Sequence, residues 1–373
     1  MKYYIIAGEA SGDLHGSNLI KQIHLQDKEA TIHCWGGQKM QSAGATLVKD
    51  YKELAFMGFV EVVLNIRSIL KNIKFCKEDI LSFQPDVVVL IDYPGFNIRI
   101  AEWAKKNNFK TAYYISPQVW AWKENRVKTL KKCIDKMIVI LPFEKDFYKK
   151  WNFEVDYVGH PLVEVIREYQ STHIKVDNLN KPIIALLPGS RKQEITVKLP
   201  IMLSVCNSFP DYQFVVAKAP GQDNEFYAPF LAPYQNVTSA TEQTYDLLNN
   251  ASAALVTSGT ATLETALFYV PEVVCYKGNS ISYEIAKRVI KIKYISLVNL
   301  IMDKPVVKEL IQHDLTTENC IKELKEILGN EQRKIALKKD YKALTKLLTE
   351  GGNASENAAV IICTLATNHP QKK

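Results

Sequence analysis

The sequence predicts two α/β domains, each built on a doubly wound parallel sheet. The chain has 373 residues, of which 47% are hydrophobic and 23% charged, and a typical domain takes roughly 100 to 200 residues. Short apolar runs alternate with segments of helical period, and this pattern weakens across Gly159–Lys181 before it restarts. Strands that are apolar throughout and are each followed by a helix are typical of parallel sheets covered on both faces.

The first half contains four such strand–helix pairs, which predict a domain over residues 1–165. The expected strands are Tyr3–Ala7, Val87–Ile91, Thr111–Ile115 and Met137–Leu141. The helices that follow them are expected at Ser17–Gln26, Ile98–Asn107, Lys123–Lys132 and Phe143–Lys150.

The second half repeats the pattern and predicts a domain over residues 166–344. Its expected strands are Ile183–Leu187, Phe214–Ala217, Ala253–Thr257 and Val273–Tyr276, and the closing helices are Thr317–Leu328, Glu331–Thr349 and Asn353–Ala366. We expect the last segment, about residues 345–373, to pack back on the first domain. Two such halves predict a cleft between them, with ligands at the carboxyl ends of the strands.

Composition limits the possible partners. The 47 Lys and Arg exceed the 40 Asp and Glu by seven, and the excess is spread along the chain, so the charge does not indicate nucleic-acid binding. An anionic small substrate and an anionic membrane surface both fit this mild basic balance. The seven cysteines form no C-x-x-C pair and are expected to be reduced thiols. With no room for a signal peptide and no run of about 18 apolar residues, we expect a cytoplasmic protein that can touch a membrane.

A polar, glycine-containing loop, Gly8–Gly16, follows the first expected strand. Its backbone N–H groups precede a helix and are suited to face an anion. The side chains of Glu9, Ser11 and Asp13 favour contact with a substrate, while the structural alternative is a tight turn in which Ser11 or Asp13 caps the helix.

Asp92 ends the apolar strand Val87–Ile91. A carboxylate at this end of a strand lies at the mouth of an α/β cleft, where a general base is useful. Alternatively, Asp92 is a turn residue before Pro94.

Two loops of the second half are suited to bind a diphosphate. Leu187–Arg191 offers a glycine, a hydroxyl and a guanidinium that can grip phosphate oxygens bidentately. Thr257–Glu264 again places hydroxyl and N–H groups at a helix start, and Glu264 lies about two turns into that helix. The alternatives are a turn with an N-cap for the first loop and a solvated carboxylate for Glu264.

Two basic segments remain open to structural and functional interpretations. Residues 56–77 have apolar side chains at helical spacing with basic ones between them, which predicts an amphipathic helix that either packs on its own domain or faces lipid. The cluster Lys123, Arg126, Lys128, Lys131, Lys132 and Lys136 is more typical of a solvated face than of a phosphate site. The sequence has no D-x-D, H-E-x-x-H or G-x-S-x-G motif, so we expect no metal and no cofactor.

Taken together, eight motifs in order closely resemble the lipid-A-disaccharide synthase family from residue 1 to about residue 310, and more loosely beyond. They are Gly8–Asp13, Met57–Val62, Ile91–Asn97, Ser116–Trp122, Leu141–Glu144, Val158–Pro161, Leu187–Arg191 and Thr257–Thr260. The resemblance implies a GT-B fold and an inverting, metal-independent glycosyltransferase. Its implied reaction couples UDP-2,3-diacylglucosamine to 2,3-diacylglucosamine 1-phosphate and releases UDP, in lipid A biosynthesis.

The resemblance also implies roles for individual residues. Asp92 matches the general base that deprotonates the acceptor's 6-hydroxyl, although Tyr93-Pro-Gly95 differs from the pattern of many relatives. The implied substrate-binding residues are Glu9, Ser11, Asp13, Arg191, Ser258, Gly259, Thr260, Glu264 and Asn299. Because the substrates are acylated, we expect peripheral contact with the inner membrane of a Gram-negative bacterium through Phe59, Val63, Arg67, Leu70 and Lys71.

Other classes fit less well. A UDP-N-acetylglucosamine 2-epimerase or a cell-wall N-acetylglucosaminyltransferase would share the architecture but not the run Ser116–Trp122. A protein that only binds nucleotide or lipid would release no UDP. A nicotinamide oxidoreductase is disfavoured because the first turn lacks G-x-G-x-x-G. The sequence leaves the oligomeric state open.

Overall fold

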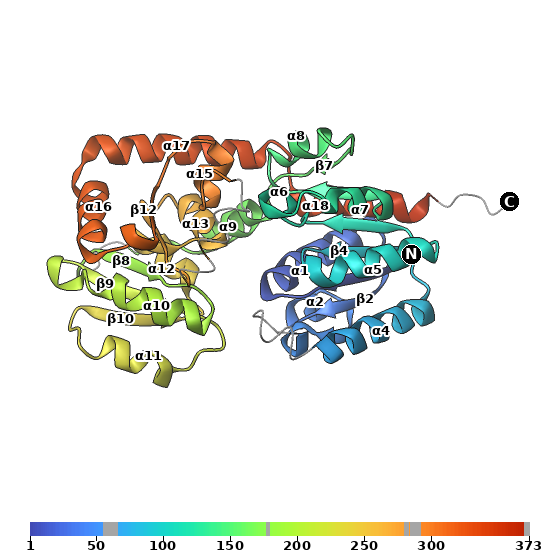
Figure 1. The fold of residues 1–373 in the computed structure, drawn as a ribbon, viewed down its shortest axis with the longest axis horizontal. Helices are drawn as coiled ribbons and strands as arrows, with labels where there is room; N and C mark the ends of the chain where they lie inside the picture. Colours follow the sequence, from blue (N-terminus) through green and yellow to red (C-terminus); the bar gives the residue numbers. More distant parts are fainter. Residues whose placement is uncertain (55–65, 177–179, 280–282, 284–291, 369–373) are drawn as a thin grey trace. The chain divides into compact units, whose positions relative to one another are not determined.

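The chain divides into two compact units in the computed structural model, which describes residues 1–54, 66–176, 180–279, 283 and 292–368. The first unit comprises Met1–Pro161 together with Leu348–Lys373, and the second comprises Leu162–Leu347 (Figure 1). The chain therefore begins and ends in the first unit.

The first unit is built on a parallel sheet, which has seven strands among the described residues, in the order β3-β2-β1-β4-β5-β6-β7. Neighbouring strands β1 and β4 pair in parallel although helices and two other strands separate them in sequence. Their carboxyl ends form the point at which the strand order reverses, where open α/β sheets bind ligands. The strands are β1 Lys2–Ala7, β2 Thr31–Gly36, β3 Thr46–Asp50, β4 Val87–Ile91, β5 Thr111–Tyr114, β6 Lys136–Val139 and β7 Asp156–Tyr157.

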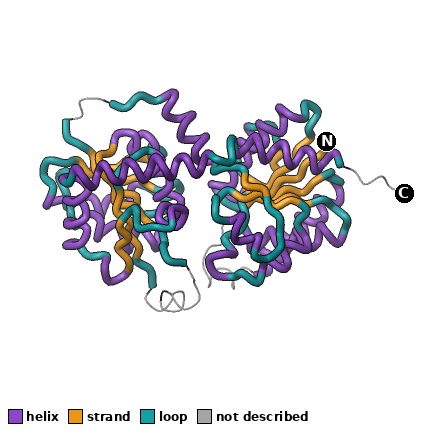
Figure 2. The backbone as a smooth tube through the Cα atoms, turned by 90° about the horizontal axis from the view of Figure 1, so that it is seen from above, coloured by secondary structure: helices purple, strands orange, loops and turns teal. Residues whose placement is uncertain are grey.

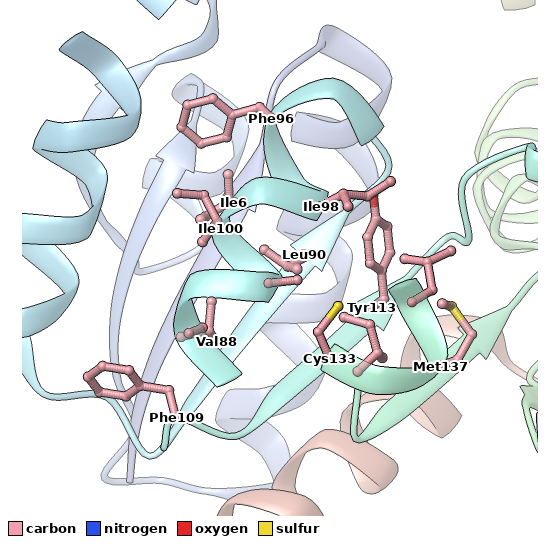
Figure 3. Packing of buried hydrophobic residues seen from close by; sticks show 14 of the residues in the cluster. Ile6, Val88, Leu90, Phe96, Ile98, Ile100, Phe109, Tyr113, Cys133 and Met137 are labelled. Atoms are coloured by element: carbon pink, nitrogen blue, oxygen red, sulfur yellow. The ribbon is translucent and has the colours of Figure 1, made fainter. Parts of the chain in front are cut away.

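Helices flank this sheet, as Figure 2 shows for the orange strands and purple helices. Alternate side chains of a strand point to opposite faces, and Ile6, Val88 and Leu90 belong to one buried cluster with residues of α4, α5 and α7 (Figure 3). Helix α18 packs against α1. The helices are α1 Ala10–Gln26, α2 Gln38–Ser42, α4 Ile66–Phe83, α5 Pro94–Lys106, α6 Val119–Trp122, α7 Arg126–Cys133, α8 Glu144–Lys149 and α18 Ala354–Thr367, with a 3-10 turn at Tyr51–Leu54.

Lys110 ties the last helix to the first unit. Its Nζ atom donates to the carbonyl oxygens of Leu365 at 2.9 Å and Ala366 at 3.1 Å, in the last turn of α18. A cation at the carboxyl end of a helix satisfies free carbonyl groups and favours the helix dipole. Lys110, which directly precedes β5, thus binds a helix end more than 250 residues away in sequence.

The second unit has the same plan. Among the residues that the structure describes, its parallel sheet has six strands in the order β10-β9-β8-β11-β12-β13, which reverses between β8 and β11. The strands are β8 Ile183–Leu187, β9 Gln213–Lys218, β10 Val237–Thr241, β11 Ala251–Thr257, β12 Glu272–Tyr276 and β13 Lys308–Ile311. The helices are α9 Pro161–Thr172, α10 Lys192–Leu203, α11 Asn224–Leu231, α12 Thr244–Asn250, α13 Thr260–Leu267, α15 Leu297–Met302, α16 Thr317–Gly329 and α17 Glu331–Thr349, with 3-10 turns at Cys206–Ser208 and Gln312–Asp314.

The predicted class, two doubly wound α/β domains, is confirmed. Strands β4 and β8 and helix α17 have the predicted bounds. The first helix begins at Ala10, earlier than the expected Ser17, because the whole polar loop after Glu9 is already helical. All seven cysteines are free thiols, and six of them are buried.

Candidate active site

Three loops meet at one edge of the first sheet. Because β1, β4 and β5 are parallel neighbours, their carboxyl ends lie at the same edge. The loop after β1 contains Glu9, the loop after β4 begins with Asp92, and the loop after β5 contains Ser116 and leads into the short helix α6. The structure thus brings Glu9 and Asp92 together at the reversal point of the sheet.

Asp92 has an unusual backbone conformation that its neighbours hold in place. Its φ is 44° and that of Tyr93 is 48°, both in the left-handed region, which costs a residue with a side chain about 1–3 kcal/mol. The carbonyl oxygen of Asp92 accepts hydrogen bonds from Tyr113 Oη at 2.5 Å and from Asn97 Nδ2 at 2.8 Å. Asn97 and Tyr113 are completely buried, so these two donors fix the turn that aims the Asp92 carboxylate.

The Asp92 carboxylate is electrostatically suited to accept a proton near neutral pH. Burial, and after it the negative charge of Glu9, together raise its pKa to about 6, against the opposing effect of a hydrogen bond from the Tyr93 backbone. A general base works best when its pKa lies near the operating pH. Asp92 also lies where the sequence predicts it, directly after the buried strand β4 at the edge of the sheet where ligands bind.

The loop after β1 is shaped by a close approach to the loop after β4. A Cβ atom at Gly8 would lie 2.3 Å from Cγ of Tyr93, so only glycine leaves room for the ring. Glu9 is the N-cap residue of α1 but its side chain makes no capping bond there. Ser11 is exposed in the first turn of that helix.

Asp13 has a structural set of partners. Its side chain is only 3% exposed, and Oδ1 accepts from the backbone N–H groups of Gly37 at 2.7 Å and Met40 at 3.0 Å, while Oδ2 accepts from Lys39 at 3.2 Å. Asp13 thus caps the beginning of α2 rather than its own helix. Contact between Asp13 and substrate stays a prediction, and these bonds favour a role in positioning.

The segment after β5 is hydrogen-bonded to a buried carboxylate, Glu144, which was not among the predicted site residues. Glu144 accepts from Trp120 Nε1 at 3.2 Å and from the backbone of Leu141 at 2.9 Å, and burial raises its pKa to about 7. Ser116 is hydrogen-bonded to Tyr148 at 2.7 Å. The signal in the sequence was the pair of motifs Ser116–Trp122 and Leu141–Glu144, which these bonds now connect.

The second unit places its predicted residues on two loops at the carboxyl ends of β8 and β11, which are also parallel neighbours. Arg191 is the N-cap residue of α10, its side chain is 60% exposed, and Nη1 lies 3.8 Å from Glu194 Oε1. Gly259, with φ 143°, precedes α13, and the exposed Thr260 begins it. Free N–H groups at such a helix start favour an anion.

Glu264 and Ser258 are partly satisfied within the protein. Glu264 Oε1 accepts from Tyr245 Oη at 3.0 Å, and burial raises the pKa of this carboxyl group. It is therefore half-buried rather than a solvated carboxylate on a helix face. Ser258 Oγ donates to the Ile295 carbonyl oxygen at 2.7 Å.

Asn299 is completely buried and its side chain is used within the protein. Its Nδ2 atom donates to Val307 O and to Glu309 Oε1, both at 2.9 Å, and its Oδ1 atom accepts from Val307 N at 2.8 Å. Glu309 also accepts from the backbone of Ser296 at 2.9 Å. Direct contact between Asn299 and nucleotide stays a prediction, and these bonds favour a role in fixing the start of α15.

Sequence reasoning missed Lys198, a buried cation at the same edge. Its side chain is 4% exposed, and its Nζ atom is hydrogen-bonded to Thr257 Oγ1 and lies 3.8 Å from Glu194 Oε2. Burial lowers the pKa of Lys198. The available signal was its position in α10 beside the buried residues Ile195 and Leu199, where a lysine needs a partner.

The residues predicted to meet the membrane are only partly described. Phe59 and Val63 lie outside the described residues. Arg67, Leu70 and Lys71 are exposed on α4, and Leu70 keeps 59% of its surface. Ile73 belongs to the same helical pattern of apolar residues as Leu70. It is only 6% exposed and is part of the core, because the inner face of α4 packs against the sheet. Among the residues described, no helix is long and apolar enough to cross a membrane.

Comparison with solved structures supports the architecture. A glycosyltransferase of kitacinnamycin superposes with a TM-score of 0.68 at 12% identity, over 98% of each chain. A UDP-GlcNAc 2-epimerase from Neisseria meningitidis gives 0.66 at 12% identity, over 98% of this chain and 99% of that one. At this identity the likeness shows the fold alone, and it agrees with the expected GT-B plan.

Comparison with protein families and curated sequences is more specific. A family model described as Lipid-A-disaccharide synthetase matches residues 3–362, which includes most of the segment beyond residue 310 where we expected only a loose resemblance. The lipid-A-disaccharide synthase of Syntrophus aciditrophicus is 38% identical over 97% of both chains. That of Coxiella burnetii is 36% identical over 97% of both. The chain therefore belongs to the lipid-A-disaccharide synthase family of glycosyltransferases.

Proposed function

We propose that this protein couples UDP-2,3-diacylglucosamine to 2,3-diacylglucosamine 1-phosphate. The acceptor's 6-hydroxyl oxygen forms a bond to the anomeric carbon of the donor sugar as the bond to UDP breaks, and the hydroxyl proton passes to a base. Attack from the side opposite the leaving group inverts the anomeric centre. The names of the relatives and the family match support this reaction.

The observation that carries the proposal is the state of Asp92. Its carboxylate follows the central strand β4 at the reversal point of the sheet, and its pKa of about 6 leaves it ionised at neutral pH yet basic enough to accept a proton. Its turn is held by two buried donors, Tyr113 and Asn97. A preorganised base avoids the cost of ordering the side chain during the reaction.

The loops of the second unit are proposed to bind the UDP portion of the donor. The leaving diphosphate gains negative charge as the sugar departs, and the Arg191 guanidinium together with N–H groups at the start of α13 would stabilise it. Ser258, Gly259 and Thr260 bring those groups close to the ligand, and Glu264 would accept hydrogen bonds from ribose hydroxyls. This assignment uses no metal ion.

The substrates carry acyl chains, so the protein must meet a lipid surface. We propose peripheral contact with the inner membrane through the exposed face of α4 and the preceding segment. Leu70 would enter the boundary between headgroups and acyl chains while Arg67 and Lys71 meet anionic lipid, each worth about 1 kcal/mol.

The test is incubation of the purified protein with both acyl sugars in detergent, with mass detection of the disaccharide 1-phosphate and UDP. We expect both products only when donor and acceptor are present, and we expect the rate to survive EDTA. Release of UDP from the donor alone would point to an epimerase-like or hydrolytic reaction. Loss of the rate in EDTA with recovery in Mg²⁺ would contradict the metal-independent mechanism.

A further inference from the structure

An exposed tryptophan with two cations against its ring lies after β5. Trp122 keeps 51% of its surface exposed. Lys123 Nζ lies 4.1 Å from the centre of the Trp122 ring, and the guanidinium carbon of Arg126 lies 5.9 Å from it. The ring fills no core position, and neither cation's side chain is hydrogen-bonded to another of the elements that the structure describes.

Two other basic residues of the same segment are already bonded within the protein. Lys131 donates to the Trp151 carbonyl oxygen at 3.2 Å, and Lys136 pairs with Asp156 at 3.4 Å. Within the part of the chain that the structure describes, no carboxylate forms an ion pair with Lys123 or Arg126. The neighbouring Glu124 is therefore not paired with either cation, and both side chains are available to a ligand.

The arrangement is electrostatically unfavourable until an anion is present. Arg126 begins α7, whose first turn holds no acidic side chain, so the positive end of the helix dipole adds to the two cations. Partial burial and the charge of Arg126 lower the pKa of Lys123. A ligand of two negative charges would relieve this repulsion, and a phosphate monoester fits two adjacent cations.

The position of the group points to a particular phosphate. The positive charge of Arg126 acts on the buried hydroxyl group of Tyr113, and this hydroxyl donates to the carbonyl oxygen of Asp92 at 2.5 Å. The cations thus lie at the same sheet edge as the proposed base, in the same unit. The acceptor is the substrate that reacts with that base, and it carries a phosphate on its sugar.

We propose that Trp122, Lys123 and Arg126 form the subsite for the acceptor's phosphate. Arg126 and Lys123 would bind the phosphate oxygens, and the Trp122 ring would hold both cations in place and offer an apolar surface to the sugar. The inference rests on the proposed function. It adds a recognition element that would separate a sugar 1-phosphate from a sugar without phosphate.

The test compares two acceptors in detergent micelles, 2,3-diacylglucosamine 1-phosphate and the same sugar without phosphate. For Arg126→Met, we expect KM for the phosphorylated acceptor to rise about 10- to 100-fold, the loss typical of a charged phosphate contact. KM for the UDP-sugar and the rate with the unphosphorylated acceptor should hardly change. Lys132→Met, which removes an exposed cation from the far end of α7, is the control and should behave like wild type.

Each other outcome points elsewhere. An equal loss with both acceptors would show a structural role for Arg126 and overturn the proposal. Unchanged kinetics in micelles with weaker binding of Arg126→Met to vesicles of phosphatidylglycerol would assign the group to membrane phosphate instead. If the wild-type protein formed no disaccharide at all, the proposed function would fail first, and this failure is visible before any variant is compared.

Discussion

The ring of Tyr93 lies directly over Gly8. A Cβ atom at Gly8 would stand 2.3 Å from Cγ and 2.4 Å from Cδ1 of that ring, well inside the distance that two carbon atoms tolerate. This contact joins the loop after β1, which presents Glu9, to the loop after β4, which presents Asp92. The position of each loop therefore depends on the position of the other.

We expect Gly8→Ala to reduce turnover at least tenfold, because the new methyl group displaces Tyr93 and with it the neighbouring base; a misplacement of about 1 Å can cost 100-fold. Adding Tyr93→Ala should restore part of the rate. Gly95→Ala is the matched control, since a Cβ there meets nothing within 4 Å, and it should keep wild-type turnover. Steady-state kinetics measures the turnover of each variant. Equal turnover for Gly8→Ala and wild type would show that the contact between Gly8 and Tyr93 is not tight.

The second prediction concerns Asp92 itself. Asp92→Asn should lose about 100- to 10,000-fold in kcat, the usual effect of removing a general base. The variant should remain folded. Since the folded pKa of about 6 lies above the ordinary value of 3.8, ionisation costs stability as pH rises from about 4 to 6, and the amide avoids that cost. Its melting temperature at pH 8 should therefore equal or exceed that of wild type; wild-type turnover would remove Asp92 from the mechanism.

The third prediction uses the pH dependence of kcat/KM. A base with a pKa of about 6 must be deprotonated, so the rate should fall as pH drops through 6. Glu9→Gln removes the negative charge that raises this pKa, and the acidic limb should move to lower pH. Glu29→Gln, an exposed carboxylate beyond the other end of α1, makes the same change in net charge and should leave the limb in place. A limb that moves equally in both variants would contradict a local effect of Glu9.

The fourth prediction concerns Arg191. Arg191→Lys keeps the charge but removes the planar fork that binds two phosphate oxygens at once, so we expect UDP to bind at least about tenfold more weakly. Isothermal titration with UDP measures this. Lys192→Met, the next residue along α10 and also exposed, should bind UDP normally. Unchanged affinity in Arg191→Lys would mean that another group holds the diphosphate.

The sequence allowed the central strands to be predicted because they are buried on both faces. Val87–Ile91 and Ile183–Leu187 are uninterrupted apolar runs, and their observed bounds match the expected ones. The outer strands β3 and β10 were not predicted. They lie at sheet edges, most of their residues are at least partly exposed, and they contain polar residues such as Lys49 and Ser239. Periodicity detects burial, and edge strands lack it.

The candidate site was predictable in its loops but not in its contacts. Asp92 was identified because it ends an apolar strand, yet the fixed turn around it depends on Asn97 and on Tyr113, which lies in the next strand. Asp13 and Asn299 have the residue types of binding groups, and the structure shows them bonded to backbone groups 24 and 8 residues away. Such distant pairings leave no local pattern in one sequence.

The last prediction separates membrane contact from core packing on α4. Leu70 is 59% exposed whereas Ile73, one turn further, is 6% exposed. Leu70→Ser should therefore weaken binding to phosphatidylglycerol vesicles in a flotation assay and leave the melting temperature unchanged. Ile73→Ser should lower the free energy of unfolding by about 2–5 kcal/mol, as other large-to-small core changes do. Leu81 lies near the other end of α4 and is also exposed, with 45% of its surface free, so Leu81→Ser should change neither quantity. If Leu70→Ser binds vesicles like wild type in low salt, this face of α4 does not touch the bilayer, because an inserted leucine cannot be exchanged for serine without loss of apolar burial.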